Sequence, residues 1–268
     1  MLKSCLLAAI SLSFIVQHAL SQKVGIQPSI LEYHLSPGTT ESQVIRIANL
    51  SDKKLSFEAY LADWLRDSTG AHEYFKPDTL PSSCTRWIYL SKNFIEVEPG
   101  KTEELLVRLQ GPPDLTAFKQ MRWAMLFLQS ASEKDSTSRT GKQFNTKIKE
   151  VLRVGIHIYQ TPPSITRAEA KGIALKEVPA EKNTYDFYMA NTGETMLECK
   201  VHMELTNVET GKEYKLDRAE FPVFPAGKRK VRLTIPDTVP KGKYSALAIL
   251  DTGEEAALEA IEKAIEVK

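Results

Sequence analysis

The sequence predicts an all-β protein built from two β-sandwich domains in tandem. Short apolar or alternating runs recur along the chain, and Gly, Pro, Asn and Asp separate them at the spacing of sandwich strands. In addition, Pro162 and Pro163 divide the 268 residues into two such series. Because prolines stiffen a linker and end a strand ladder, we expect one domain over residues 22–161 and a second over 162–268.

Residues 1–21 have the composition of a cleavable signal peptide. Lys3 precedes a run of 12 mostly apolar residues, "CLLAAISLSFIV", and the small residues Ala19 and Ser21 follow it. Such a run is too short to span a bilayer. We therefore expect cleavage before Gln22 and a secreted, periplasmic chain without an integral membrane segment, with the cell surface or the extracellular space as the alternative location.

Charge and cysteine content limit the partners. Removing Lys3 from the 35 basic residues leaves 34, which equals the number of acidic residues. A nucleic-acid-binding protein would show a basic excess, so we expect no nucleic-acid partner. Two cysteines remain, Cys84 and Cys199, one in each expected domain. Export permits a disulfide between them, but two separate thiols are the favoured prediction.

The first domain begins with extended and alternating segments. "VGIQPSILEYHL" (24–35) is an extended start, and "SQVIRIANL" (42–50) alternates, with Ile45 and Ile47 on one face. Asn49 begins a glycosylation sequon, for which a turn asparagine is the favoured interpretation. "LSFEAYLADWL" then leads into the polar corner "RDSTGAHEY".

The second half of this domain contains its most distinctive segment. Residues 87–115 predict two strands joined at Pro99-Gly100, and "MRWAMLFLQ" is the most apolar strand of the chain. A polar loop over 130–146 precedes one long strand, "KIKEVLRVGIHIYQ", with Leu152, Val154, Ile156 and Ile158 on its buried face. We expect the three tryptophans, Trp64, Trp87 and Trp123, to anchor the core of the domain, with a sugar-binding platform as the alternative.

The second domain repeats the same pattern. We expect a hairpin around Glu209–Lys212. Pro225-Ala226-Gly227 occupies the same place as Pro99-Gly100, a turn between an apolar run and an alternating strand, which suggests one unit used twice. The tail "EEAALEAIEKAIEVK" fits either a helix or a strand, and we predict a short final strand.

No residue cluster indicates catalysis. The four mature histidines, His34, His72, His157 and His202, show no metal-ligand spacing, and the cysteines lie in no nucleophile motif. We therefore predict a protein that is not an enzyme and holds no metal or cofactor, and we expect His157 to cap a surface strand. The acidic residues around "DWLRDSTGAHEYFKPD", namely Asp63, Asp67, Glu73 and Asp78, lack a calcium-loop order and favour a solvated corner over a calcium site.

The order of three segments carries a resemblance to a known family. These are "VGIQPSILEY", "WIYLSKNFIEVEPGKTEELLVRL" and "KEVLRVGIHIYQTP". Together they resemble the N-terminal domain of periplasmic pilus-assembly chaperones of the PapD-like, immunoglobulin-type fold, over most of residues 24–162. The second domain is similar to the extra immunoglobulin-like domain of bacterial surface and chaperone-like proteins.

The resemblance implies a binding function in which the last strand of the first domain completes a pilus subunit that lacks a strand. Backbone hydrogen bonds then supply affinity and alternate side chains fill the groove of the subunit. The implied partners are secreted or surface subunits and an outer-membrane assembly partner. The candidate partner-binding residues on the strand and in the cleft are Lys147, Lys149, Val151, Leu152, Arg153 and His157.

The anchor of that family differs from this sequence. Chaperones of the family grip a terminal carboxylate with two basic residues, one on the first strand and one on the last. Here the first strand has no Arg or Lys, Ile30 stands about where the family has arginine, and His157 is nearest to the other position. A chaperone should still show an open edge along 147–158 and two cationic groups converging in the interdomain cleft.

A structural or adhesive surface protein is the competing hypothesis. Surface proteins of the WxL-interacting type share the "S-P-G-x-T" turn and the "W-I…V-x-P-G-K" pattern present here. In such a scaffold, the edge of residues 147–158 should be covered or blunted by charge.

Overall fold

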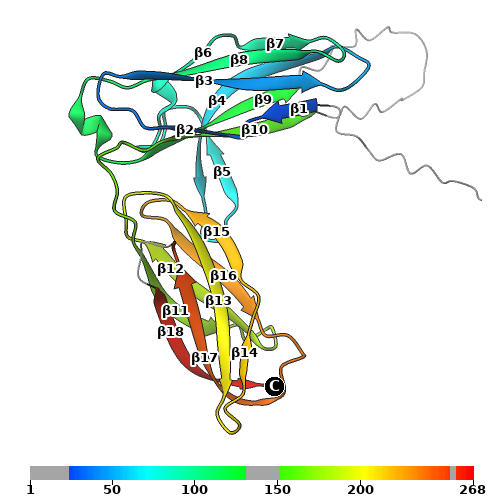
Figure 1. Cartoon of the computed structure of the whole chain (residues 1–268), viewed down its shortest axis with the longest axis vertical. Coiled ribbons are helices and arrows are strands. Elements are labelled where there is room, and N and C mark those ends of the chain that lie inside the picture. Colours follow the sequence, from blue (N-terminus) through cyan, green and yellow to red (C-terminus); the bar gives the residue numbers. More distant parts are fainter. Residues whose placement is uncertain (1–23, 131–150, 254–257) are drawn as a thin grey trace, which may run out of the picture.

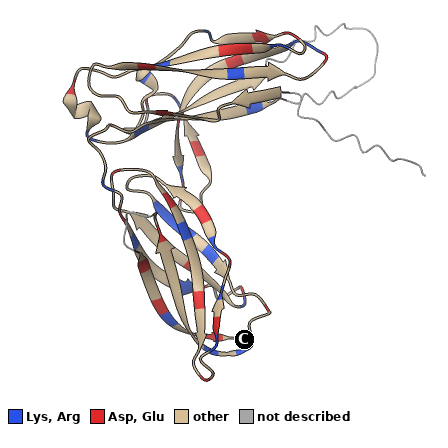
Figure 2. Cartoon of the chain, viewed as in Figure 1, with Lys and Arg blue, Asp and Glu red and all other residues tan. Residues whose placement is uncertain are grey.

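The structure, a computed structural model, describes residues 24–130, 151–253 and 258–268 (Figure 1). Over these residues the chain is all-β and forms two β-sandwiches in tandem, as predicted. Residues of both charges are interspersed over both sandwiches (Figure 2). In the described part, no helix is long and apolar enough to cross a membrane. The predicted signal peptide and most of the predicted polar loop lie outside the described residues.

The first sandwich packs a four-stranded sheet, in the order β1-β3-β8-β6, against a sheet in the order β2-β10-β9-β4-β5, with β7 also paired to β4. Its strands are β1 (Val24–Gln27), β2 (Ile30–Tyr33), β3 (Thr40–Asn49), β4 (Leu55–Arg66), β5 (His72–Phe75), β6 (Ile88–Leu90), β7 (Phe94–Val97), β8 (Thr102–Gln110), β9 (Arg122–Ser130) and β10 (Arg153–Gln160). Two short 3-10 turns, η1 (Thr85–Trp87) and η2 (Leu115–Phe118), lie between strands.

The second sandwich packs a sheet in the order β11-β12-β16 against one in the order β14-β13-β17-β18, with β15 also paired to β13. Its strands are β11 (Ala170–Glu177), β12 (Thr184–Asn191), β13 (Leu197–Asn207), β14 (Glu213–Lys215), β15 (Ala219–Val223), β16 (Lys228–Thr234), β17 (Gly242–Asp251) and β18 (Glu259–Val267). The predicted hairpin is confirmed as β13–β14, and the predicted final strand is confirmed as β18.

Each sandwich has its own hydrophobic core. Ile45 and Ile47 are fully buried in the first core, as the alternation of β3 predicts. Burial of each such side chain contributes about 1.5–3 kcal/mol.

Cys84 belongs to the first core and Cys199 to the second, and both are free thiols, which confirms the favoured prediction. Burial raises the pKa of each thiol to about 12.

The predicted hairpin at Pro99-Gly100 is wrong. The strand before the turn, β7, pairs with β4, whereas the strand after it, β8, pairs with β3 and β6 in the opposite sheet. The turn therefore carries the chain from one sheet to the other. Pro225-Ala226-Gly227 does the same between β15 and β16. Gly100 and Ala226 both have left-handed φ values, 68° and 59°.

A buried asparagine supports each of these sheet-crossing turns. Asn49 Nδ2 donates to the carbonyl oxygen of Val97 at 2.8 Å, and Asn191 Nδ2 donates to that of Val223 at 2.9 Å. Each asparagine also closes its own turn, since Asn49 Oδ1 accepts from the backbone N–H of Ser51. The interpretation of Asn49 as a turn asparagine is thus confirmed, and both halves of the predicted repeat share one hydrogen-bond arrangement.

We predict that Asn49→Ala destabilises the protein by about 2–3 kcal/mol, because it leaves buried backbone groups without partners. Urea denaturation monitored by tryptophan fluorescence measures the loss. Asn93→Ala, at an exposed position of the same sandwich, is the control and should stay within about 0.5 kcal/mol of wild type. Equal stability of the two variants would contradict the role of Asn49.

Candidate functional site

The two flanks of β10 differ along its length. On one side β10 pairs with β9 over its whole extent, from Arg153 to Gln160. On the other side β2 pairs with it in parallel, but only over His157–Gln160. Within the described residues, no strand covers the second flank of 153–156. This half of β10 is therefore a free sheet edge, and the other half lies inside the sheet.

A fully open edge over 147–158 is therefore not observed, and the reason lies in the first strand. The extended start is broken at Pro28, which has no N–H to donate to a ladder. The segment before it, β1, pairs with β3 in one sheet, and the segment after it, β2, pairs with β10 in the other. Because β2 begins at Ile30, its parallel ladder reaches no further along β10 than His157.

Exposed apolar side chains surround the free edge. Val151 and Leu152 precede it with 48% and 42% of their surface exposed, and Ile30 at the start of β2 has 45% exposed. The expectation that Leu152 is buried is thus wrong, whereas Ile156 and Ile158 are fully buried as predicted. Two further candidates, Lys147 and Lys149, lie outside the described residues.

Arg153 lies over the outer face of the sheet. Its guanidinium carbon is 4.7 Å from the ring centroid of Phe127 and 5.8 Å from that of Tyr74. Such cation–π contacts hold the charge on aromatic rings. The charge therefore does not blunt the edge in the way expected for a protein that prevents strand addition.

The far end of the same face is buried by an aromatic cluster that joins the two sandwiches. Phe224, from the second sandwich, lies with its ring centroid 5.1 Å from Trp64, 4.7 Å from Trp123 and 5.7 Å from Tyr159. Trp123 Nε1 also donates to the carbonyl oxygen of Trp64 at 2.8 Å. Trp64 and Trp123 are buried in this cluster and not in the core of the first sandwich, which corrects the prediction; Trp87 alone packs against that core.

His157 is part of this interior and does not cap a surface strand. Its ring centroid lies 4.9 Å from that of Trp64 and 5.6 Å from that of His72, and its Nε2 is buried without a hydrogen-bond partner among the residues that the structure describes. Burial, together with His72 and Arg66, lowers the pKa of His157 to about 4. The ring is consequently neutral at pH 7. His157 pairs in register with Ile30, so the two anchor positions meet without a positive charge.

Two arginines that the sequence patterns did not reveal converge near this cluster. Arg66 ends β4, and its Nη1 donates to the carbonyl oxygen of Gly70 at 3.2 Å. Arg229 comes from β16, and its Nη1 lies 2.1 Å from the point where a Cβ on Gly70 would stand. Only glycine leaves room for this contact. Burial and the neighbouring Arg66 lower the pKa of Arg229.

The β4–β5 hairpin brings these arginines together. It extends from the first sandwich toward the second (Figure 1), and Lys230 N donates to the carbonyl oxygen of Ser68 at the hairpin tip at 2.8 Å. Asp67 Oδ1 accepts the backbone N–H groups of Thr69, Gly70 and Ala71, which keeps the tip closed.

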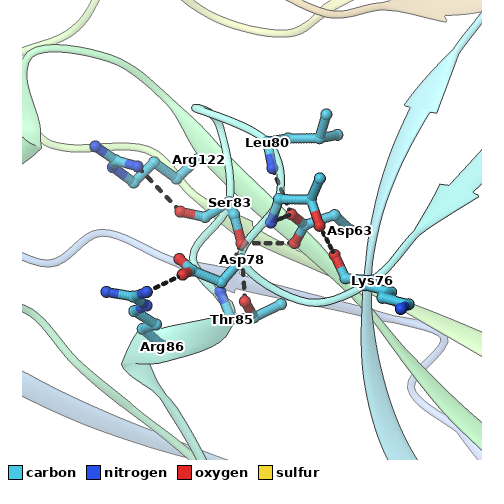
Figure 3. A network of polar contacts seen from close by, with 9 residues as sticks. Asp63, Lys76, Asp78, Leu80, Ser83, Thr85, Arg86 and Arg122 are labelled. Atoms are coloured by element: carbon cyan, nitrogen blue, oxygen red, sulfur yellow. Dashed lines mark hydrogen bonds and ion pairs between the residues drawn. The ribbon is translucent and has the colours of Figure 1, made fainter.

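The predicted acidic corner is only partly solvated: Glu73 and Asp78 are exposed, as expected, whereas Asp63 is buried in an ordered network. Asp63 is 1% exposed and accepts hydrogen bonds from Thr79 N, Leu80 N and Ser83 Oγ at 2.6–2.8 Å (Figure 3). This network ties the segment after β5 to β4. Among the described residues, no group of three or more His, Cys, Asp or Glu side chains could hold a metal ion.

Comparison with known proteins identifies the fold. No family model and no curated protein matches the sequence. Among solved structures, a chaperone–tip adhesin complex of CFA/I fimbriae biogenesis is 8% identical, with a TM-score of 0.51 over 91% of this chain and 98% of that chain. The class 5 fimbriae chaperone CfaA is 10% identical, with a TM-score of 0.47 over 90% and 98%.

A third similar structure is the CsuC–CsuE chaperone–tip adhesion subunit pre-assembly complex of Acinetobacter baumannii, which is 11% identical, with a TM-score of 0.45 over 78% of this chain and 90% of that chain. The fold of the chain is thus that of fimbrial chaperones with two immunoglobulin-like sandwiches, which confirms the resemblance noted in the sequence. At these identities the likeness concerns the fold.

We predict that His157 makes the protein less stable in acid. The unfolded chain binds a proton at this histidine below about pH 6.5, whereas the folded chain does not until about pH 4. The stability that the neutral His157 ring contributes to the folded protein is therefore fully present above pH 6.5, and it is lost as the pH falls toward 4. Since the ring is partly exposed, we expect a loss of about 1–2 kcal/mol.

Urea denaturation between pH 7.5 and pH 4 tests this expectation. His157→Gln should show a shallower fall in the free energy of unfolding than wild type, and His34→Gln, at an exposed position, should follow wild type. An unchanged fall in His157→Gln would show that another group causes the acid sensitivity.

Proposed function

We propose that the protein is a non-enzymatic, periplasmic chaperone that holds secreted or surface subunits of the pilus type by β-strand addition at the free edge of β10. It comprises domains 22–161 and 162–268 after a cleaved signal peptide over residues 1–21. The fold match to fimbrial chaperones supports the general role. An outer-membrane assembly partner is part of the same proposal.

The observation that carries this proposal is the free flank of residues 153–156. The backbone groups of β10 that point away from β9 have no strand partner here among the described residues. Unpaired N–H and C=O groups on a sheet edge are a template for another strand. A guest segment added here would satisfy these groups, while Val151, Leu152 and Ile30 offer apolar contacts beside it.

The candidate residues have distinct roles in this proposal. Val151 and Leu152 contact the guest, and Arg153 stays on its aromatic rings. Lys147 and Lys149, which lie outside the described residues, remain candidates from the sequence. His157 is too enclosed to bind a carboxylate as a cation. Because β2 begins opposite it, His157 instead marks the end of the free edge of β10. An adhesive or structural surface protein without capping activity is the alternative, and an edge without any guest would favour it.

We predict a sharp boundary in amide hydrogen exchange at His157. In the free protein, amides of 157–160 should exchange slowly because both flanks are paired, whereas those of 153–156 that face away from β9 should exchange quickly. A bound subunit should slow the latter by on the order of tenfold or more. Exchange measured by NMR on the free protein and on the complex tests this. Slow exchange along all of 153–160 in the free protein would contradict the proposed free edge at residues 153–156.

We predict that Val151→Lys together with Leu152→Lys weakens binding of a co-expressed pilus-type subunit by at least about tenfold, roughly 1.4 kcal/mol. Co-purification and titration measure the effect, and circular dichroism checks the fold. Leu50→Lys together with Leu115→Lys is the matched control, since these side chains are even more exposed and belong to segments that do not pair with β10. Retention of the subunit by the folded edge variant would contradict strand addition at this place.

A further inference from the structure

Arg66 and Arg229 form a pair of like charges with unused hydrogen-bond donors. Arg66 Nε, Arg229 Nε and Arg229 Nη1 are buried and have no hydrogen-bond partner in the described part of the chain. Among the described residues, no carboxylate oxygen lies within 4 Å of either guanidinium. A buried donor without a partner costs free energy, and the cost is larger when the group is charged. Two such groups at one place indicate a missing acceptor.

Aromatic rings support both guanidinium groups but cannot replace an acceptor. The guanidinium carbon of Arg66 lies 5.7 Å from the ring centroid of Trp64, and that of Arg229 lies 5.0 Å from the ring centroid of Phe221. These contacts hold the planar groups in place. They leave the N–H edges free, and both side chains keep part of their surface accessible to solvent.

The acidic groups nearby do not neutralise the pair. Asp67 raises the pKa of Arg229, but its Oδ1 is already engaged by the hairpin tip. Arg66 lowers the pKa of Glu198, although burial raises it more, and no ion pair forms between them. Burial, and to a lesser degree Arg66, lowers the pKa of His72 and His157, and an imidazole supplies no negative charge in either protonation state.

We propose that Arg66 and Arg229 bind a small divalent oxoanion, of the sulfate or phosphate type, between the two sandwiches. A guanidinium donates two parallel N–H bonds to such an anion, and two guanidinium groups match its charge. One arginine belongs to each sandwich, so the bound anion ties the first sandwich to the second. This site lies on β4 and β16, apart from the β10 edge, and does not depend on a guest polypeptide.

The test is a titration of the full mature chain with sodium sulfate, at constant ionic strength set with sodium chloride. The Nε–H resonances of Arg66 and Arg229 in a nitrogen–proton NMR spectrum should shift and saturate in the millimolar range. The unfolding midpoint should rise by about 2–4 °C beyond the general salting-out effect of sulfate.

Variants and a second anion separate specific binding from general salt effects. Arg66→Gln and Arg229→Gln should each lose the additional rise in midpoint, while Arg46→Gln, at an exposed arginine paired with Glu104, should keep it. Sodium acetate at the same ionic strength should give less than half the effect. Three results would each overturn the proposal. They are Nε–H resonances that do not shift in wild type, a sulfate response that is unchanged in both Arg66→Gln and Arg229→Gln, and equal effects of acetate and sulfate.

Discussion

The contact of Phe224 with Trp64, Trp123 and Tyr159 is the interaction on which the rest of the structure depends. A sheet of the first sandwich has two faces, and its inner face packs on the sandwich core. Large aromatic rings on the outer face would be costly to leave in water, since each buries on the order of 150–250 Å². The second sandwich covers one end of that face with Phe224, and this creates a buried corner that also encloses His157.

The same corner determines which part of β10 remains available. β2 pairs with the end of β10 nearest the second sandwich, where Tyr159 and Gln160 are buried. Away from the corner no described strand pairs with this flank, so the free edge is short. Within this free half lies Gly155, where a Cβ would stand 2.9 Å from Met125 Sδ. The aromatic and sulfur side chains of the outer face therefore pack directly against the backbone of the free edge.

The local features of the fold were predictable, whereas the sheet partners and the buried corner were not. Alternation placed Ile45 and Ile47 inside, and turn residues located most strands. A Pro-Gly turn, however, is equally compatible with a hairpin and with a crossing between sheets, because the turn does not encode which strand pairs with which. Arg66 and Arg229 could not be linked either, since they meet only through the position of one sandwich on the other.

The anchor position on the first strand carries no basic residue in this chain. Ile30 and His157 lie side by side, but one is apolar and the other is neutral at pH 7, so that place offers a guest no ionic contact. Two arginines, Arg66 and Arg229, lie instead on the other side of the aromatic cluster, where they contact Trp64 and Phe221. The two proposed activities, strand addition and anion binding, are thus assigned to separate places, one on the rim of the first sandwich and the other at its junction with the second. Under these two proposals, a guest segment on β10 need not carry a negative charge, and an anion at the junction acts on the position of the two sandwiches.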